Sequence, residues 1–299
     1  MGRDKDTTMN PADEFLGLPE PWPAPAKLNL CLHIVGRRDD GYHLLQSAMQ
    51  LIDLCDELQF YLRPPGVIER VGDNADIPAD ADLIVRAARL LATRYEVFDG
   101  VGIEIKKRIP VQGGLGGGSS DAATVLVALN ELWRLGLKIE QLASLGLELG
   151  ADVPVFVRGH SAWAEGVGEQ LTPCDFPEQV FLVIKPETGV STATVFQDPE
   201  LTRDSPVTTV GAFLAGGGHN DCTPVVRKRS GEIAEALEWL GDFGGAKLTG
   251  TGACVFVALP DEATARSVAA RVPSRWTGYV VRGLNRSPLL ERLAHESFG

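Results

Sequence analysis

The sequence contains few cysteines and few histidines, and neither type is grouped. Its five cysteines and five histidines are scattered over 299 residues, with no Cys-x-x-Cys pair and no His-x-x-x-His pair. Disulfide frameworks and zinc sites both need such grouping, so neither is expected to organise this fold. Unpaired cysteines are typical of a reducing compartment, and we therefore expect a cytoplasmic protein with no metal site built from its own side chains.

Long apolar runs are also missing, and positive charge is scarce. No run approaches the roughly 20 residues that span a bilayer, and residues 1–21 are polar and proline-rich rather than apolar like a signal peptide, so we expect a disordered leader there. The 28 Lys and Arg residues face 40 Asp and Glu residues, a net charge of −12. An acidic surface repels nucleic-acid backbones. We expect a small-molecule partner, no nucleic acid and no membrane, and either a monomer or a homodimer.

The clearest strand pattern runs from Ala26 to Ile34. Apolar side chains alternate with others, which places Lys27, Asn29, Cys31 and His33 together on the second face. Lysine is ordinarily solvated. The pattern alone therefore leaves open whether Lys27 is a surface residue or part of a site.

The rest of the chain alternates between strand-like and helix-like segments, which is typical of an α+β protein. Two domains are expected, 22–165 and 166–290, because the pattern changes to shorter strands near residue 166. Further strands are predicted over 51–61, 101–105, 153–157, 180–184, 253–258 and 278–281. Helices are predicted over 82–95, 122–135, 139–149, 232–240 and 262–271.

The segment from Gly113 to Ser120 carries the strongest signal. Five glycines and two serines stand between a predicted strand and a buried helix, which Ser119, Ser120 or Asp121 could cap. Glycine lets backbone amides turn inward, and the start of the helix adds free N–H groups and the positive end of its dipole. The segment therefore predicts an anion site that needs no lysine.

Two familiar nucleotide loops do not fit this segment. A P-loop requires Lys after its last glycine, and here Ser119 follows Gly118. A dinucleotide fingerprint that starts at Gly114 would need glycine at position 119. A flexible turn is the remaining alternative, and it is disfavoured because an apolar helix follows directly.

The stretch from Pro110 to Ala123 resembles the phosphate loop of the GHMP kinases, a superfamily of small-molecule kinases. One branch is similar over nearly the whole range from Pro25 to Arg282: the branch that acts on a methylerythritol linked to cytidine diphosphate. Its further blocks occur here in order as Pro25–Leu30, Gly36–Arg38, Asp40–His43, Gly150–Phe156, Gly159–His160, Ala164–Glu169, Lys185–Pro186, Gly189–Ser191, Asn220–Asp221 and Leu248–Gly252.

The resemblance implies a two-domain fold, with an N-terminal ATP-binding domain, a C-terminal ferredoxin-like domain and the site in the cleft between them. It implies phosphorylation of the 2-hydroxyl of that substrate, in the non-mevalonate route to isoprenoids, with Mg²⁺ carried on ATP. The ATP-binding residues would be Pro110, Val111, Gln112, Gly113, Gly114, Leu115, Gly116, Gly117, Gly118, Ser119 and Ser120.

The same resemblance assigns roles to six further residues. Asp152 would be the catalytic base and Lys27 the catalytic cation, with Asn29 holding the substrate near its reacting hydroxyl. Tyr42 and Phe196 would stack on cytosine and His43 would bond its edge. A second glycine turn, with Thr249 and Thr251, would either close over the substrate or simply join two strands.

Two positions depart from the pattern of the family. Gln112 adds bulk at the mouth of the loop, and Asp82 stands where asparagine is common, near the adenine side. Two alternative functions are kept beside the main interpretation. One is another GHMP kinase of the homoserine or mevalonate type, which the Asp40–His43 block disfavours. The other is a non-catalytic nucleotide-binding regulator.

Overall fold

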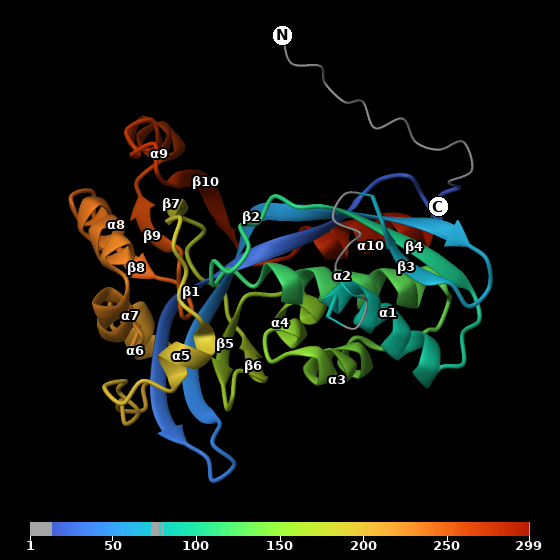
Figure 1. Ribbon diagram of the computed structural model, residues 1–299, viewed down its shortest axis with the longest axis horizontal. Coiled ribbons are helices and arrows are strands. Elements are labelled where there is room, and N and C mark those ends of the chain that lie inside the picture. Colours follow the sequence, from blue (N-terminus) through green and yellow to red (C-terminus); the bar gives the residue numbers. More distant parts are fainter. Residues whose placement is uncertain (1–13, 73–77, 79–80, 299) are drawn as a thin grey trace.

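We analysed a computed structural model of the chain, which describes residues 14–72, 78 and 81–298. In this described part, ten strands form one mixed sheet that runs through the whole molecule (Figure 1). Helices α1 to α4 and α10 lie around one half of the sheet, and α5 to α9 lie around the other half (Figure 1). The expected α+β fold is observed.

Eleven of the twelve predicted segments overlap an element of the predicted type, and the remaining elements were not predicted. The strands are β1 (Trp22–Arg37), β2 (His43–Arg63), β3 (Ile68–Val71), β4 (Gly100–Lys106), β5 (Ala162–Glu165), β6 (Gln170–Pro173), β7 (Val180–Lys185), β8 (Lys247–Leu248), β9 (Val255–Leu259) and β10 (Thr277–Leu284). The helices are α1 (Leu83–Arg94), α2 (Gly117–Leu132), α3 (Ile139–Leu149), α4 (Val153–Arg158), α5 (Thr192–Phe196), α6 (Val210–Leu214), α7 (Thr223–Arg229), α8 (Gly231–Gly241), α9 (Glu262–Ala269) and α10 (Pro288–Phe298).

The long antiparallel pair of β1 and β2 connects the two halves of the molecule. β2 pairs with β1 over most of its length, and along its other edge with β5, β10 and β4. The last strand, β10, pairs with β7 in the second half and returns to β2 through Gly283 and Leu284. The boundary expected near residue 166 is therefore crossed by a continuous sheet.

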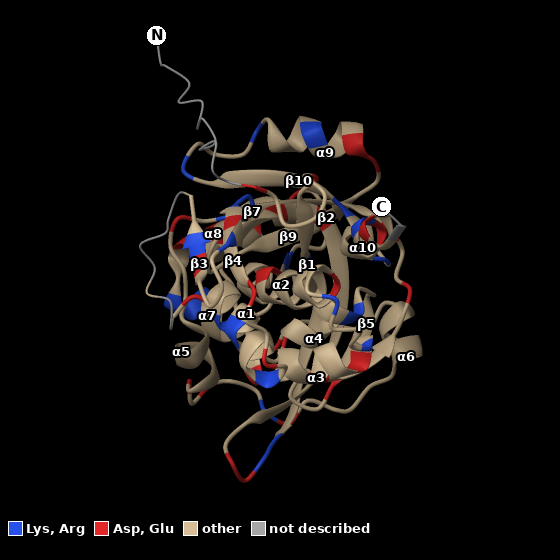
Figure 2. Cartoon of the chain, turned by 90° about the vertical axis from the view of Figure 1, so that its right-hand side faces the viewer, with Lys and Arg blue, Asp and Glu red and all other residues tan. Residues whose placement is uncertain are grey.

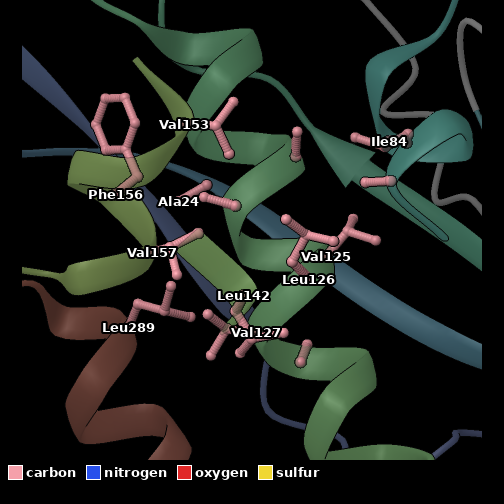
Figure 3. Packing of buried hydrophobic residues seen from close by; sticks show 14 of the residues in the cluster. Ala24, Ile84, Val125, Leu126, Val127, Leu142, Val153, Phe156, Val157 and Leu289 are labelled. Atoms are coloured by element: carbon pink, nitrogen blue, oxygen red, sulfur yellow. The ribbon is translucent and has the colours of Figure 1, made fainter. Parts of the chain in front are cut away.

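The first half is built around helix α2, whose residues from Ser120 to Leu129 are all buried. Figure 3 shows Val125, Leu126 and Val127 of α2 within a cluster that includes Phe156 of α4 and Leu289 of α10. A helix that is apolar on nearly all sides must be surrounded by other elements. Its N-terminus is consequently fixed in position relative to the strands.

The second half buries both faces of its sheet. Leu182 of β7 and Val257 of β9 pack with helices α8 and α9. Phe181 and Val183 of β7 point the other way and pack with Leu28 of β1. This second contact places the middle of β1 between the two halves.

The predicted strand over residues 153–157 is wrong, because the structure has helix α4 there. Three valines suggest a strand. However, Pro154 stands in the first turn of α4, where a residue without an N–H is tolerated and its fixed φ suits a helix. Asp152 therefore stands at a junction between two helices, α3 and α4.

The predicted alternation of β1 is also interrupted. The register with β2 shifts between Asn29 and Cys31, which makes Leu30 part of a β-bulge. Lys27 and Asn29 line a cavity, as does Leu32, whereas Cys31 packs on the other side against Trp163. The bulge reverses the pattern that had placed Cys31 with Lys27.

The expected leader divides into two parts. Residues 1–13 lie outside the described residues. The segment 14–21 contacts the first half: the Leu16 N–H donates to the Phe60 carbonyl at 2.9 Å, and Arg292 of α10 donates to the Glu20 carbonyl at 3.1 Å. Arg292 also lies over the Trp22 ring, 4.4 Å from its centre.

In the cartoon of Figure 2, positions of Lys and Arg are interspersed along the chain with positions of Asp and Glu. Within the described residues, no helix is both long enough and apolar enough to cross a bilayer.

We expect Leu126→Ala to lower the free energy of unfolding by about 2–5 kcal/mol, because it leaves a cavity around the buried helix α2. Leu147→Ala is the matched control, since this leucine of α3 is 43 % exposed and its truncation should cost much less. Urea denaturation followed by circular dichroism measures both. Equal losses in the two variants would contradict the packing described for α2.

Candidate active site

Three adjoining cavities form a row, and the second and third are lined by residues of both halves. The first, about 640 Å³, is lined by the glycine loop and the start of α1. The second, about 350 Å³, shares Gly114, Gly116 and Ser119 with the first and is also lined by Lys27 and Asp152. The third, about 540 Å³, is lined by residues of the β1–β2 turn and of α5. It shares four residues with the second cavity, Leu45, Ala151, Val167 and Phe196.

The glycine loop leads into helix α2 earlier than the sequence predicts. The helix begins at Gly117, its N-cap is Gly116, and no side chain caps it. Ser119, Ser120 and Asp121 lie inside the first turns, so the prediction that one of them caps the helix is wrong. The first amides of α2 are left without a side-chain acceptor, and they lie where the loop lines the first two cavities.

Glycine is required at two positions of this loop. Gly114 and Gly116 both have φ of +74°, which other residues adopt only with strain. A Cβ atom on Gly114 would lie 2.4 Å from the Thr249 carbonyl oxygen, and one on Gly116 would lie 2.7 Å from the Phe156 ring. The loop therefore packs against both halves of the molecule at once.

Lys27 and Asp152 meet at the centre of the row. The Lys27 Nζ lies 3.5 Å from Asp152 Oδ2, and it donates to the Gly114 carbonyl oxygen at 3.1 Å and to Asn29 Oδ1. The Lys27 side chain is only 4 % exposed, whereas that of Asp152 is 34 % exposed. A buried ammonium is thus held by three oxygen atoms, and the carboxylate beside it stays accessible from the cavity.

Asn29 is fixed by strand β2 and by the turn between β8 and β9. Its side-chain amide donates to Ser47 Oγ of β2 at 2.8 Å, and its backbone N–H donates to Thr249 Oγ1 at 3.0 Å. The Thr249 hydroxyl in turn donates to the Gly114 carbonyl at 3.3 Å. The second glycine turn, which joins β8 and β9, therefore also braces the glycine loop.

The first cavity contains charged residues that the sequence did not single out for a role. Lys107 Nζ donates to Asp56 Oδ2 at 2.5 Å and to Asp121 Oδ2 at 2.7 Å. Burial alone would lower the pKa of Lys107, but the two carboxylates outweigh it and raise that pKa above its usual value. This stable cation lines the cavity beside the start of α2.

Asp82, one of the two departures from the family pattern, has a structural role. Its Oδ1 accepts the Ile84 N–H at 3.0 Å and so caps helix α1, and its Oδ2 accepts from Arg70 Nη1 at 2.9 Å. Both side chains of this ion pair are nearly buried and line the first cavity. The second departure, Gln112, adopts a φ of +55° at the mouth of the loop.

Tyr42, His43 and Phe196 line the third cavity together, as the resemblance implied. The His43 and Phe196 rings are stacked with centres 5.0 Å apart, and Tyr42 is 65 % exposed in the turn between β1 and β2. Arg203, which the sequence did not point to, donates from Nε to His43 Nε2 at 3.1 Å. No spacing rule could have found this contact, because 160 residues separate its two partners.

Comparison with known proteins agrees with this arrangement. Residues 82–160 match the family model "GHMP kinases N terminal domain", and residues 201–278 match "GHMP kinases C terminal". The two-domain fold and the glycine-loop site are therefore those of the GHMP kinase superfamily.

Curated relatives show which branch of the superfamily this chain resembles. The chain is 54 % identical over 272 residues to a 4-diphosphocytidyl-2-C-methyl-D-erythritol kinase of Nitrosococcus oceani, covering 91 % of this chain and 97 % of the relative. It is 55 % identical over 275 residues to the kinase of the same name from Alkalilimnicola ehrlichii, covering 92 % and 94 %. A solved structure of 4-(cytidine 5'-diphospho)-2C-methyl-D-erythritol kinase is 32 % identical, with a TM-score of 0.76 and coverage of 88 % and 98 %. This chain belongs to the 4-diphosphocytidyl-2-C-methyl-D-erythritol kinase family.

We expect Gly116→Ala to weaken ATP binding about tenfold or more, because a left-handed backbone costs other residues roughly 1–2 kcal/mol and the new Cβ would meet Phe156. Gly136→Ala is the matched control, with a similar φ of +66° but no atom within 4 Å. Isothermal titration calorimetry measures both affinities. The geometry assigned to the loop would be refuted if the two variants bound ATP equally well.

Proposed function

We propose that this chain phosphorylates the 2-hydroxyl of 4-diphosphocytidyl-2-C-methyl-D-erythritol with ATP, in the non-mevalonate route to isoprenoids. The membership in this kinase family, over nine-tenths of the chain, supports the reaction and the substrate. The observation that carries the chemistry is the meeting of Lys27 and Asp152 at 3.5 Å. Both residues line the second cavity, which adjoins the first cavity at the glycine loop and the third cavity of Tyr42 and His43.

Asp152 is the proposed acceptor of the hydroxyl proton. As the alcohol oxygen forms its bond to the γ-phosphorus of ATP, the bond from that phosphorus to the β-phosphate oxygen breaks and ADP leaves. The hydroxyl proton passes to the Asp152 carboxylate, which lies 3.5 Å from the Lys27 ammonium. Lys27 also stabilises the negative charge on the moving phosphoryl group. Asn29 orients the alcohol beside this pair.

The glycine loop, from Pro110 to Ser120, would hold the triphosphate. Uncapped amides of α2 and the positive end of its dipole point to a phosphate site there. Such local donors are necessary, because the protein as a whole carries a net charge of −12 and repels anions. The Lys107 ammonium lines the same cavity, but its charge is balanced by the carboxylates of Asp56 and Asp121.

Mg²⁺ would accompany ATP rather than occupy a site built by side chains. Among the described residues, no group of three or more His, Cys, Asp or Glu side chains could hold a metal ion. The hard oxygens that line the second cavity, Ser119 Oγ and the Asp152 carboxylate, suit the outer ligands of an ion held mainly by phosphates and water. When bound, Mg²⁺ neutralises charge on the triphosphate.

The third cavity is the proposed cytidine pocket, with Tyr42 and Phe196 as stacking partners and His43 at the edge of the base. The cytoplasm is the proposed location, in accord with five free cysteines. The proposed partner is the small-molecule substrate alone, without nucleic acid, and the protein acts as a monomer or homodimer. A silent regulator is disfavoured, since the base and the cation are both present and adjacent.

We expect Asp152→Asn to reduce kcat by about 10²–10⁴-fold, the usual contribution of a general base, while ATP affinity is retained. Glu148→Gln is the control, because this exposed carboxylate pairs with Arg94 outside the cleft. ADP release in a coupled assay gives the rate, and calorimetry gives the affinity. Unchanged turnover by Asp152→Asn would refute its assignment as the base.

A panel of alcohols tests the substrate. With purified protein and Mg-ATP, we expect turnover of 4-diphosphocytidyl-2-C-methyl-D-erythritol and none of homoserine or mevalonate, because only the first carries a base for the third cavity. ADP release measures all three. Turnover of homoserine or mevalonate alone would overturn the proposed function and favour a different kinase of the same superfamily.

A further inference from the structure

Arg203 contacts both His43 and Phe196, which line the third cavity where the cytosine ring is proposed to bind. Its Nε donates to His43 Nε2 at 3.1 Å, and its Nη2 donates to the Phe196 carbonyl oxygen at 2.9 Å. Further bonds run from Nη2 to the Asp198 carbonyl at 2.8 Å and from Nη1 to the Leu201 carbonyl at 3.0 Å. The guanidinium is thus held by three carbonyls between Phe196 and Leu201, and it directs its Nε–H at one nitrogen of the histidine.

This contact determines which nitrogen of His43 carries the proton. An arginine is always protonated, and its Nε is a donor without a lone pair to accept a bond. His43 Nε2 must therefore be the acceptor, and in a neutral imidazole the proton then resides on Nδ1. Among the described residues, no hydrogen bond to Nδ1 competes with this arrangement, and the ring lines the cavity.

The surroundings of His43 keep the ring neutral. Burial lowers the pKa of His43, and the positive charges of Arg203 and Arg37 lower it further. A neutral ring with a fixed tautomer offers one N–H donor. A free histidine would exchange between two tautomers and offer a donor or an acceptor at the same place.

We propose that Arg203 is a positioning residue that selects the base of the substrate, by fixing His43 as an Nδ1–H donor toward the ring of a pyrimidine. This inference rests on the proposed function. Cytosine has an acceptor at N3 that a donor can satisfy. Uracil has an N–H at the same position, so two donors would face one another and both would remain unpaired, which is costly in a buried site.

The first test uses the unaltered protein. In ¹⁵N-labelled protein at neutral pH, we expect the His43 resonances of a protonated Nδ1 and an unprotonated Nε2, assigned by comparison with His43→Gln. A signal of the opposite tautomer, or of an exchanging mixture, would overturn the proposal. Because no change to Arg203 is involved, this result stands even if the variants below do not fold.

The second test uses Arg203→Lys, which keeps the charge but loses the planar fork of donors. We expect KM for the cytidine-linked substrate to rise about tenfold, the value of one well-placed hydrogen bond near a buried group, with a much smaller change in kcat. We also expect the preference for this substrate over its uridine analogue to fall about tenfold, and the His43 tautomers to mix.

Arg229→Lys is the matched control. Arg229 holds the same loop through the Asp198 carboxylate but makes no contact with His43. Equal effects of the two variants on KM, base preference and tautomer would show that Arg203 acts only by stabilising the loop, and would overturn the proposal. If the unaltered protein does not turn over the cytidine-linked substrate, the proposed function fails, whereas the tautomer measured in the free protein is still readable.

Discussion

The geometry of the candidate active site depends on one backbone oxygen, the carbonyl oxygen of Gly114. It accepts one hydrogen bond from the Lys27 ammonium of β1 and another from the Thr249 hydroxyl in the turn between β8 and β9. Three segments that are far apart in the sequence are thereby held at one point. The positive φ of Gly114 turns this oxygen toward both donors, and the absence of a Cβ lets the Thr249 backbone approach closely.

This contact explains why the cavities adjoin in a row. The loop belongs to the first half of the molecule and the second glycine turn to the other half, so their contact sets how the two halves meet. Lys27 and Asp152 lie beside the contact, between a cavity lined by the glycine loop and a cavity lined by aromatic rings. Donors that are fixed in this way can bind an anion despite the acidic character of the whole protein, because little energy is lost in reorienting them.

The sequence was sufficient to predict the loop, the strand that carries Lys27 and five of the ten helices in the described residues. These features depend on local spacing: glycine clusters and apolar periodicity are visible in a single chain. Three local predictions failed for local reasons. Helix α2 begins at Gly117, before the residues that were expected to cap it. The valines around Pro154 suggested a strand although the proline favours the first turn of a helix, and the bulge at Leu30 reversed the faces of β1.

The remaining site residues could not be predicted from spacing. Arg203 meets His43, and Lys107 meets Asp56, only because the folded chain brings them together. Ordinary arginines and lysines have no pattern around them that distinguishes a structural or positioning role from a solvated one. The resemblance to the GHMP kinases supplied the pairing of Lys27 with Asp152, which residue patterns alone left open.

The ladder between β1 and β2 has a consequence for how the protein can move and evolve. Two domains joined by a single linker can rotate about a hinge and can be exchanged between proteins as modules. Here a pair of long strands belongs to both halves, and the last strand closes the sheet from the other end. A cut near residue 166 would separate β10 from its partner β2 and remove β1 from the sheet face that it covers. The two halves are therefore one cooperative unit, in which opening of the cleft is limited to bending of shared strands.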